Sequence, residues 1–163
     1  MSKRLTADDA RQSLSGHAAA RGAEIFEKYG PRIGWNELLR ILEDRACVRY
    51  PCQIVFDPAP LQKGECAYPK PNGGRPEDGF VIHVHPLFMT EMDRVAHLAL
   101  YQLVVVNYGE FASSDDAEAF GAAALGIPRE EYYRGLCEMA DLLEGQAVSR
   151  GVEGSTPQKM SFK

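Results

Sequence analysis

Imidazole side chains offer the most versatile chemistry in this sequence, and three of its four histidines lie between residues 83 and 97. His97 belongs to the segment "DRVAHLALYQ", where Tyr101 follows it by four positions and shares its face on a helix. The same spacing lets two histidines of an H-E-x-x-H helix bind one zinc ion, but here the five letters are H-L-A-L-Y. The segment is therefore an unusual zinc site, an altered one, or a core helix that contains one histidine.

A second pair of histidines stands two apart in "GFVIHVHPLF", the clearest strand pattern in the chain. Alternation places Val81, His83 and His85 on one face of that strand, and Ile82 and Val84 on the other. Side chains at i and i+2 lie side by side and can bind a metal, but a solvated strand face also carries polar residues in this way. Both interpretations are open from the sequence.

The composition is that of an ordinary globular domain, with 45% hydrophobic and 25% charged residues. A net charge of −5, with no Lys/Arg-rich run, argues against nucleic acid or an anionic membrane as the partner. The N-terminus has no apolar signal region, and the longest apolar run, 98–106, is too short to span a bilayer. These features predict a cytoplasmic protein whose four cysteines are reduced thiols.

Periodicity predicts an α+β fold in which one buried helix is the central element. The helix that contains His97 is apolar almost all round from Val95 to Val106, which is typical of an element buried on most sides. Thr6, Thr90 and Ser113 or Ser114 are the expected N-caps. In chain order, the expected elements are a helix over 7–28, a helix over 34–46, a strand near 47–57, a short strand around 65–68, a strand within 79–88, and helices over 91–109, 115–127 and 128–151.

A single domain over 1–150 accounts for all of these elements, arranged as a small mixed or antiparallel sheet against the central helix and flanking helices. The last helix carries Tyr132, Leu136, Met139 and Leu143 on one stripe. Residues 151–163 lack a periodic pattern and are expected to form a disordered tail.

Over residues 45–128 the chain resembles the zincin-like metallopeptidases of the ImmA/IrrE type. In that family an edge strand borders the active-site cleft, the next helix carries H-E-x-x-H, and the helix after it carries a third metal ligand. His97 falls where the first histidine belongs. The segment "EAFGAAALGIP", from Glu118 to Pro128, resembles the third-ligand helix, so Glu118 would be that ligand.

The departures from the family pattern concern the chemistry. Leu98 occupies the position of the catalytic glutamate, and Tyr101 occupies that of the second histidine. A leucine cannot act as a general base on a zinc-bound water. Arg94 lies one turn before His97 and could pair with Glu118, so that a guanidinium replaces the charge of the metal. The resemblance thus implies an altered centre formed by His97, Tyr101, Glu118 and Arg94.

Two interpretations of the ionisable residues stay open. Some set of His83, His85, His97 and Glu118 could bind zinc, because a catalytic zinc needs three protein ligands. Alternatively no cofactor binds, His83 and His85 face solvent, and His97 is a buried histidine hydrogen-bonded to Glu118 or Tyr101.

The favoured functional hypothesis is a non-catalytic zincin-like protein that binds a protein or peptide. The peptide would lie along an edge strand containing Phe80, Ile82, His83 and His85, through main-chain hydrogen bonds. The first alternative is a divergent zinc metallohydrolase using His97, Glu118 and a strand histidine. The second is a structural accessory domain with coincidental similarity. The long amphipathic helices at both ends could also pair in a homodimer.

Overall fold

The computed structural model describes the backbone of residues 7–149 and the side chains of residues 13–146. The expected α+β class is confirmed, and the sheet is mixed. The elements are α1 (Ala7–Tyr29), α2 (Trp35–Glu43), β1 (Cys52–Val55), β2 (Ala67–Pro71), β3 (Phe80–Val84), α3 (Met92–Tyr108), α4 (Ser114–Leu125) and α5 (Arg129–Ser149), with the 3-10 helices η1 (Pro76–Asp78), η2 (Pro86–Thr90) and η3 (Gly109–Phe111). The predicted Thr6 cap and the tail over 151–163 lie outside the described residues.

The strand predicted to be an edge is instead the central strand. The sheet order is β1-β3-β2, with β1 parallel and β2 antiparallel to β3. The backbone of β3 is therefore hydrogen-bonded on both sides, and the prediction that a peptide adds to an edge strand at Phe80, Ile82, His83 and His85 is wrong. Alternation reveals the two faces of a strand, but it does not reveal how many neighbours the strand has.

The antiparallel edge of the sheet, β2, contains Pro69 and Pro71. Hydrogen bonds from His85 N to Cys66 O and from Asn72 N to Gly79 O fix which β2 residues bond to β3. Residues 67, 69 and 71 consequently direct their backbone groups away from the sheet. Because proline has no N–H, two of these three outward positions lack a donor, and the edge is poorly suited to pairing with another strand.

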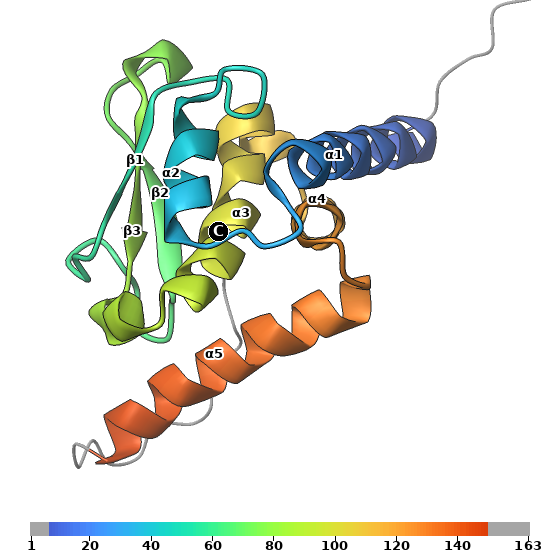
Figure 1. The fold of residues 1–163 in the computed structure, drawn as a ribbon. Coiled ribbons are helices and arrows are strands. Elements are labelled where there is room, and N and C mark those ends of the chain that lie inside the picture. The colour runs from blue at the N-terminus through green and yellow to red at the C-terminus, as the bar shows by residue number, and fades with distance from the viewer. Residues whose placement is uncertain (1–6, 150–163) are drawn as a thin grey trace, which may run out of the picture.

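One face of the sheet packs on α3, as Figure 1 shows. Ala67, Ile82 and Val84 belong to this face and are fully buried. The predicted alternation along β3 is correct, because His83 pairs across the opposite face with Tyr68. His83 is nevertheless only 9% exposed, so the expectation of a solvated histidine is wrong.

Helix α3 is the buried central element that the sequence predicts. From Val95 to Val106 nearly every side chain is buried, with His97 and Val105 partly exposed. The sheet and α2 lie on one side of α3, α1 and α4 pack together on the other, and α5 crosses below (Figure 1). No helix in the described part of the chain is long and apolar enough to cross a membrane.

The ends of several elements differ from the expected ones. The strand expected near 47–57 is only four residues long, because the amides of Cys47 and Val48 bond to the Asp44 carbonyl in a turn that ends α2. Thr90 lies in η2 and does not cap α3, whose N-cap is Glu91. Ser113 caps α4 as predicted, in a reciprocal pair with Asp116.

Helices α1 and α4 approach each other at Gly22. A Cβ atom added at Gly22 would meet the Phe120 carbonyl oxygen and would lie 2.9 Å from the Ala123 Cβ. Contacts under 3.0 Å require a backbone to move, because neither atom belongs to a flexible side chain.

We therefore expect Gly22→Ala to lower the free energy of unfolding by about 1–3 kcal/mol. Gly16 provides the matched control, since it lies on the same helix with nothing within 4 Å of an added Cβ. Gly16→Ala should raise stability by about 0.5–1 kcal/mol, because alanine favours a helix over glycine. Urea denaturation of both variants measures the difference, and equal effects would contradict the α1–α4 packing.

Candidate functional site

Helix α5 covers the position at which the sequence predicts a metal centre. The Tyr132 ring stacks on the His97 ring, with centroids 5.7 Å apart and planes inclined by 25°. The Tyr132 hydroxyl donates a hydrogen bond of 2.7 Å to the His97 carbonyl oxygen. Two independent contacts therefore hold α5 against the middle of α3.

Tyr132 is also the side chain around which the predicted residues converge. It is fully buried, which raises its pKa well above the usual value, and the nearby Tyr101 and Glu118 add to this effect. Burial likewise raises the pKa of Tyr101, with Glu118 adding to the effect. The structure thus brings His97, Tyr101 and Glu118 near one phenol. Arg94, which the sequence also assigns to the altered centre, pairs elsewhere, and from here on the name covers only these three residues.

Gly121 on α4 makes room for this phenol. A Cβ atom at Gly121 would collide with the ring and hydroxyl of Tyr132. The glycine within "EAFGAAALGIP" therefore has a packing role, and it faces the helix that closes the site.

The guanidinium beside Glu118 belongs to a different residue from the one expected. Arg129, at the start of α5, lies 3.2 Å from Glu118 and 3.2 Å from Asp115. Arg94 pairs with Glu91 at 3.4 Å, so the predicted Arg94–Glu118 pair is wrong. Spacing along α3 identifies Arg94 as a neighbour of His97, but it cannot show that the turn between α4 and α5 brings Arg129 to Glu118.

His97 is held in a neutral, desolvated environment. Its Nδ1 lies 3.2 Å from the Asp93 carbonyl oxygen, one turn earlier on α3. Gly135 of α5 lies beside the other edge of the ring, where an added Cβ atom would make an ordinary contact of 3.6 Å with the His97 Cδ2. Burial is the main cause that lowers the pKa of His97 below the usual 6.5.

The two strand histidines lie apart from this centre and have separate roles. His83 Nδ1 is 3.3 Å from the Asp57 carbonyl oxygen. The His85 ring accepts a hydrogen bond of 3.1 Å from Leu87 N and so caps η2. Within the described residues, no group of three or more His, Cys, Asp or Glu side chains is placed to hold a metal ion.

Three of the four cysteines are poorly suited to thiolate chemistry. All four are free, and burial raises the pKa of Cys47 to about 11 and those of Cys52 and Cys66 to about 12. These three thiols remain protonated near neutral pH, a form that is a poor nucleophile and a poor metal ligand.

Gln102 is an unusual core residue that sequence analysis did not select. It is fully buried on α3, and neither its amide nitrogen nor its amide oxygen has a hydrogen-bond partner in the described part of the chain. The signal in the sequence is a single amide within the apolar run 98–106.

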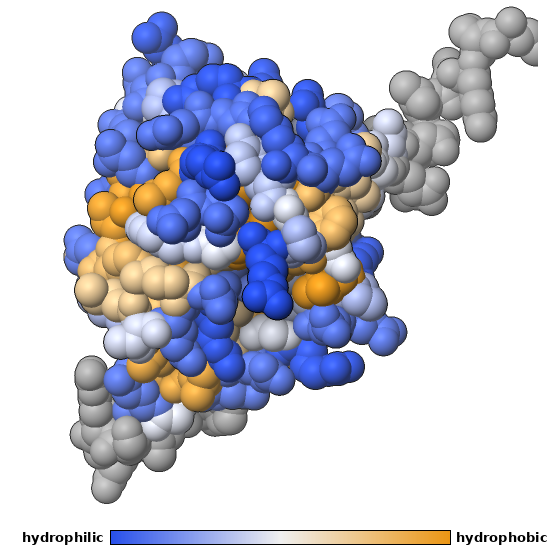
Figure 2. All heavy atoms as spheres, viewed as in Figure 1, coloured by the Kyte–Doolittle hydropathy of each residue, from blue (hydrophilic) through white to orange (hydrophobic). Residues whose placement is uncertain are grey.

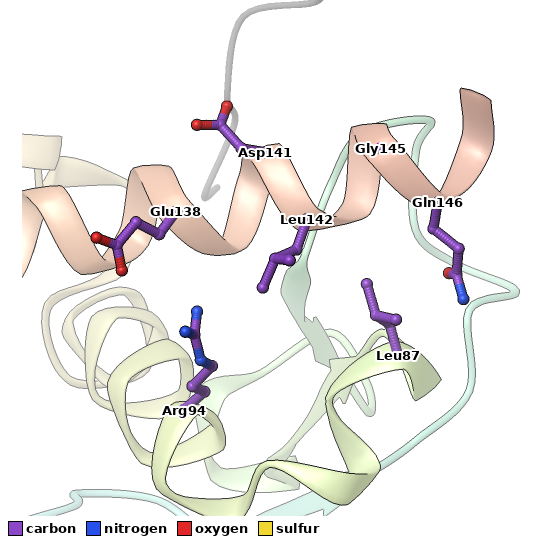
Figure 3. A pocket seen from close by; sticks show the side chains of 7 residues that line it. All are labelled: Leu87, Arg94, Glu138, Asp141, Leu142, Gly145 and Gln146. Carbon is purple, nitrogen blue, oxygen red and sulfur yellow. The ribbon is translucent and has the colours of Figure 1, made fainter. Parts of the chain in front are cut away.

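A groove of about 680 Å³ lies between the C-terminal half of α5 and the segment formed by η2 and the start of α3. Figure 3 shows Leu142 and Leu87 directed into it from opposite sides, and Arg94 directed toward α5 near Glu138. Leu142 is 45% exposed. In Figure 2, hydrophobic residues surrounded by hydrophilic ones reach the surface beside this half of α5.

Comparisons with protein-family models, with curated proteins and with solved structures each found no match to this chain.

The lowered pKa of His97 predicts a pH dependence of stability. Because the folded pKa lies below the unfolded value of 6.5, the unfolded chain takes up a proton first as the pH falls. This contribution to stability is fully present above pH 6.5 and is lost as the pH falls through the folded pKa. Urea denaturation between neutral and mildly acidic pH should show a shallower pH dependence for His97→Gln than for the parent protein. The same pH dependence of the free energy of unfolding in both proteins would show that the His97 ring is not desolvated.

Gln102 yields a second prediction. An unsatisfied buried amide costs about 1–3 kcal/mol, and methionine has a similar length and no hydrogen-bonding demand. We expect Gln102→Met to raise the free energy of unfolding by about 1–2 kcal/mol. A loss of stability measured by urea denaturation would mean that ordered water or a ligand satisfies the amide.

Proposed function

We propose that the chain is a non-catalytic zincin-like protein that binds a basic, apolar-anchored segment of a partner protein in the groove beside α5. The observation that carries the proposal is the insertion of Tyr132 into the altered centre. A hydrolytic zinc site needs an open position for water and a general base beside it. Here Tyr132 fills the space next to His97, and the buried Leu98 stands where the base would be.

The order of elements supports the zincin-like part of this proposal. A strand precedes the buried helix α3, and α4 follows it with Glu118 on the side of His97 and Tyr101. We infer from this order that the Tyr132 phenol and the Arg129 guanidinium take the place of a metal and its water.

The binding surface we propose is the groove and not a sheet edge. Strand β3 is paired on both sides, and β2 has prolines at two of its three outward positions. The groove offers apolar surface from Leu87 and Leu142, with the Glu138 carboxylate of α5 beside it, whereas Figure 3 shows the Asp141 carboxylate on the far side of α5. An apolar side chain between two elements is a common anchor in protein recognition.

Charge indicates which partner fits. Glu138 has no ion pair among the described residues, whereas the single cation of the groove, Arg94, is paired with Glu91. The chain as a whole has a net charge of −5. A segment with Lys or Arg next to a leucine- or phenylalanine-sized anchor would match both the apolar and the acidic surface.

A peptide library selected on the full-length protein tests this function. We expect enriched peptides to combine a large apolar residue with neighbouring Lys or Arg. Leu142→Lys should weaken their binding at least tenfold, because it places a cation in the apolar groove and repels a basic peptide. Fluorescence anisotropy with one enriched peptide measures the change.

Leu39→Lys is the matched control, because Leu39 is 40% exposed and Leu142 is 45% exposed, and Leu39 lies on α2. The control should bind like the parent protein. Equal binding by Leu142→Lys, or selection of acidic peptides, would contradict the proposal. A monomer formed only by the Leu142→Lys variant would show instead that a second copy of the chain occupies the groove.

A further inference from the structure

A second hollow, separate from the α5 groove, gathers three arginines. It has a volume of about 180 Å³ and lies where α1, the loop after α2 and the end of α3 meet. Arg21 comes from α1, while Arg45 and Arg49 come from the loop. No carboxylate lines it, although the chain is acidic overall. We propose that this arginine pocket binds a phosphate-class dianion.

Each guanidinium is anchored through a single nitrogen. Arg21 Nη1 donates to Ala46 O at 2.9 Å, Arg45 Nη1 to Leu42 O at 3.0 Å, and Arg49 Nη1 to Asn107 O at 3.2 Å. The Nε and Nη2 groups of all three donate to no acceptor among the described residues, although the Arg49 guanidinium also lies over the Tyr50 ring, 5.3 Å from its centroid. These fixed guanidiniums retain the paired donors that bind phosphate oxygens in a fork.

Capping of helix carbonyls explains part of this arrangement but not all of it. Cations favour helix C-termini, and the three acceptors lie at or after the ends of α2 and α3. Such caps use only the Nη1 group of each guanidinium. They leave the other N–H groups of these arginines available to an anion that enters the hollow.

The pocket has a rigid frame because Asn107 ties the loop to α3. Asn107 is only 6% exposed. Its Oδ1 accepts a hydrogen bond of 2.9 Å from Arg49 N, and its Nδ2 donates one of 2.9 Å to Cys47 O. An anion would therefore meet donors that are already ordered, which lowers the entropic cost of binding.

Tyr108 adds a neutral donor at the same place. Its ring packs edge-to-face on His17, with centroids 5.6 Å apart. Burial raises the pKa of Tyr108 despite the opposing charges of Arg21 and Arg49, so the phenol keeps its proton. A protonated hydroxyl beside guanidiniums can donate to a phosphate oxygen.

The neighbouring acids leave most of this positive charge uncompensated. Asp44 is engaged by Lys28 and Tyr29, outside the pocket lining. Glu24 reaches Arg21 at 3.6 Å, with both side chains well exposed, and such pairs contribute little. Arg45 and Arg49 have no ion pair within the described part of the chain.

The volume limits the ligand to inorganic phosphate or the phosphoryl end of a small phosphate monoester. Two-dimensional NMR on the full-length, ¹⁵N-labelled protein tests this, titrated with sodium phosphate or glycerol phosphate at constant ionic strength. Both phosphate compounds should cause saturable chemical-shift changes of the backbone amides and arginine Nε groups of this pocket. Acetate and chloride should cause none. A stronger response to glycerol phosphate would assign the site to a phosphate monoester, and a stronger response to phosphate would assign it to the free anion.

Arg21→Gln should weaken phosphate binding by about 10-fold or more, because one charge-assisted hydrogen bond contributes about 1.5–3 kcal/mol. Arg21→Lys keeps the charge but lacks the paired donors of a guanidinium. Its affinity for phosphate should therefore fall between those of the parent protein and Arg21→Gln. Arg134→Gln, an exposed substitution on α5, is the control and should bind like the parent. The spectrum of each variant reports whether it folds. The proposal is overturned if shifts do not saturate, if they lie outside the pocket, or if a folded Arg21→Gln binds as well as the parent.

Discussion

The contact between Tyr132 and His97 is the constraint on which the arrangement of this molecule depends. It fixes α5 at its N-terminal end by a ring stack and a hydrogen bond to the backbone of α3. Gly121 must lack a side chain for the phenol to fit. With Tyr132 in this position, the helical period puts Leu136, Met139 and Leu143 on the same buried stripe of α5. The side of α5 that is not used in this packing forms one wall of the groove.

A second set of contacts positions the other half of the molecule. The close approach of α1 and α4 at Gly22 is reinforced by a 2.6 Å hydrogen bond from the Ser15 hydroxyl to Asp116. Asp116 is itself held by the reciprocal cap with Ser113, so the start of α4 is tied to α1. This packing places Arg21 over the loop that follows α2.

The sequence predicted the helices better than the contacts between them. The 3.6-residue period and the caps locate α3, α4 and the buried stripe of α5, because each depends on neighbouring residues. The pairing of β3 could not be read in this way, since a strand with one neighbour and a strand with two can share one alternating pattern. The prolines of β2 were the available signal that β2 is an edge.

The same limit explains which site residues were missed. Tyr132 was identified as a core residue, correctly, but its contact with His97 joins residues 35 positions apart. Arg129 reaches Glu118 only because a turn reverses the chain between two helices. The three pocket arginines belong to two elements whose packing no periodicity describes. Charges scattered along a sequence become a site only through tertiary structure.

The residues that point toward metal chemistry in the sequence each have a structural role in the folded chain. The His97 carbonyl accepts the Tyr132 hydrogen bond, and its ring provides the stacking surface for α5. Glu118 pairs with Arg129 at the start of α5, where the two charges join α4 to the last helix. A histidine and a glutamate at these positions therefore need no metal to account for them. The opposite case is that of the three pocket arginines, whose Nη1 groups bond to carbonyl oxygens while their Nε and Nη2 groups have no acceptor among the described residues.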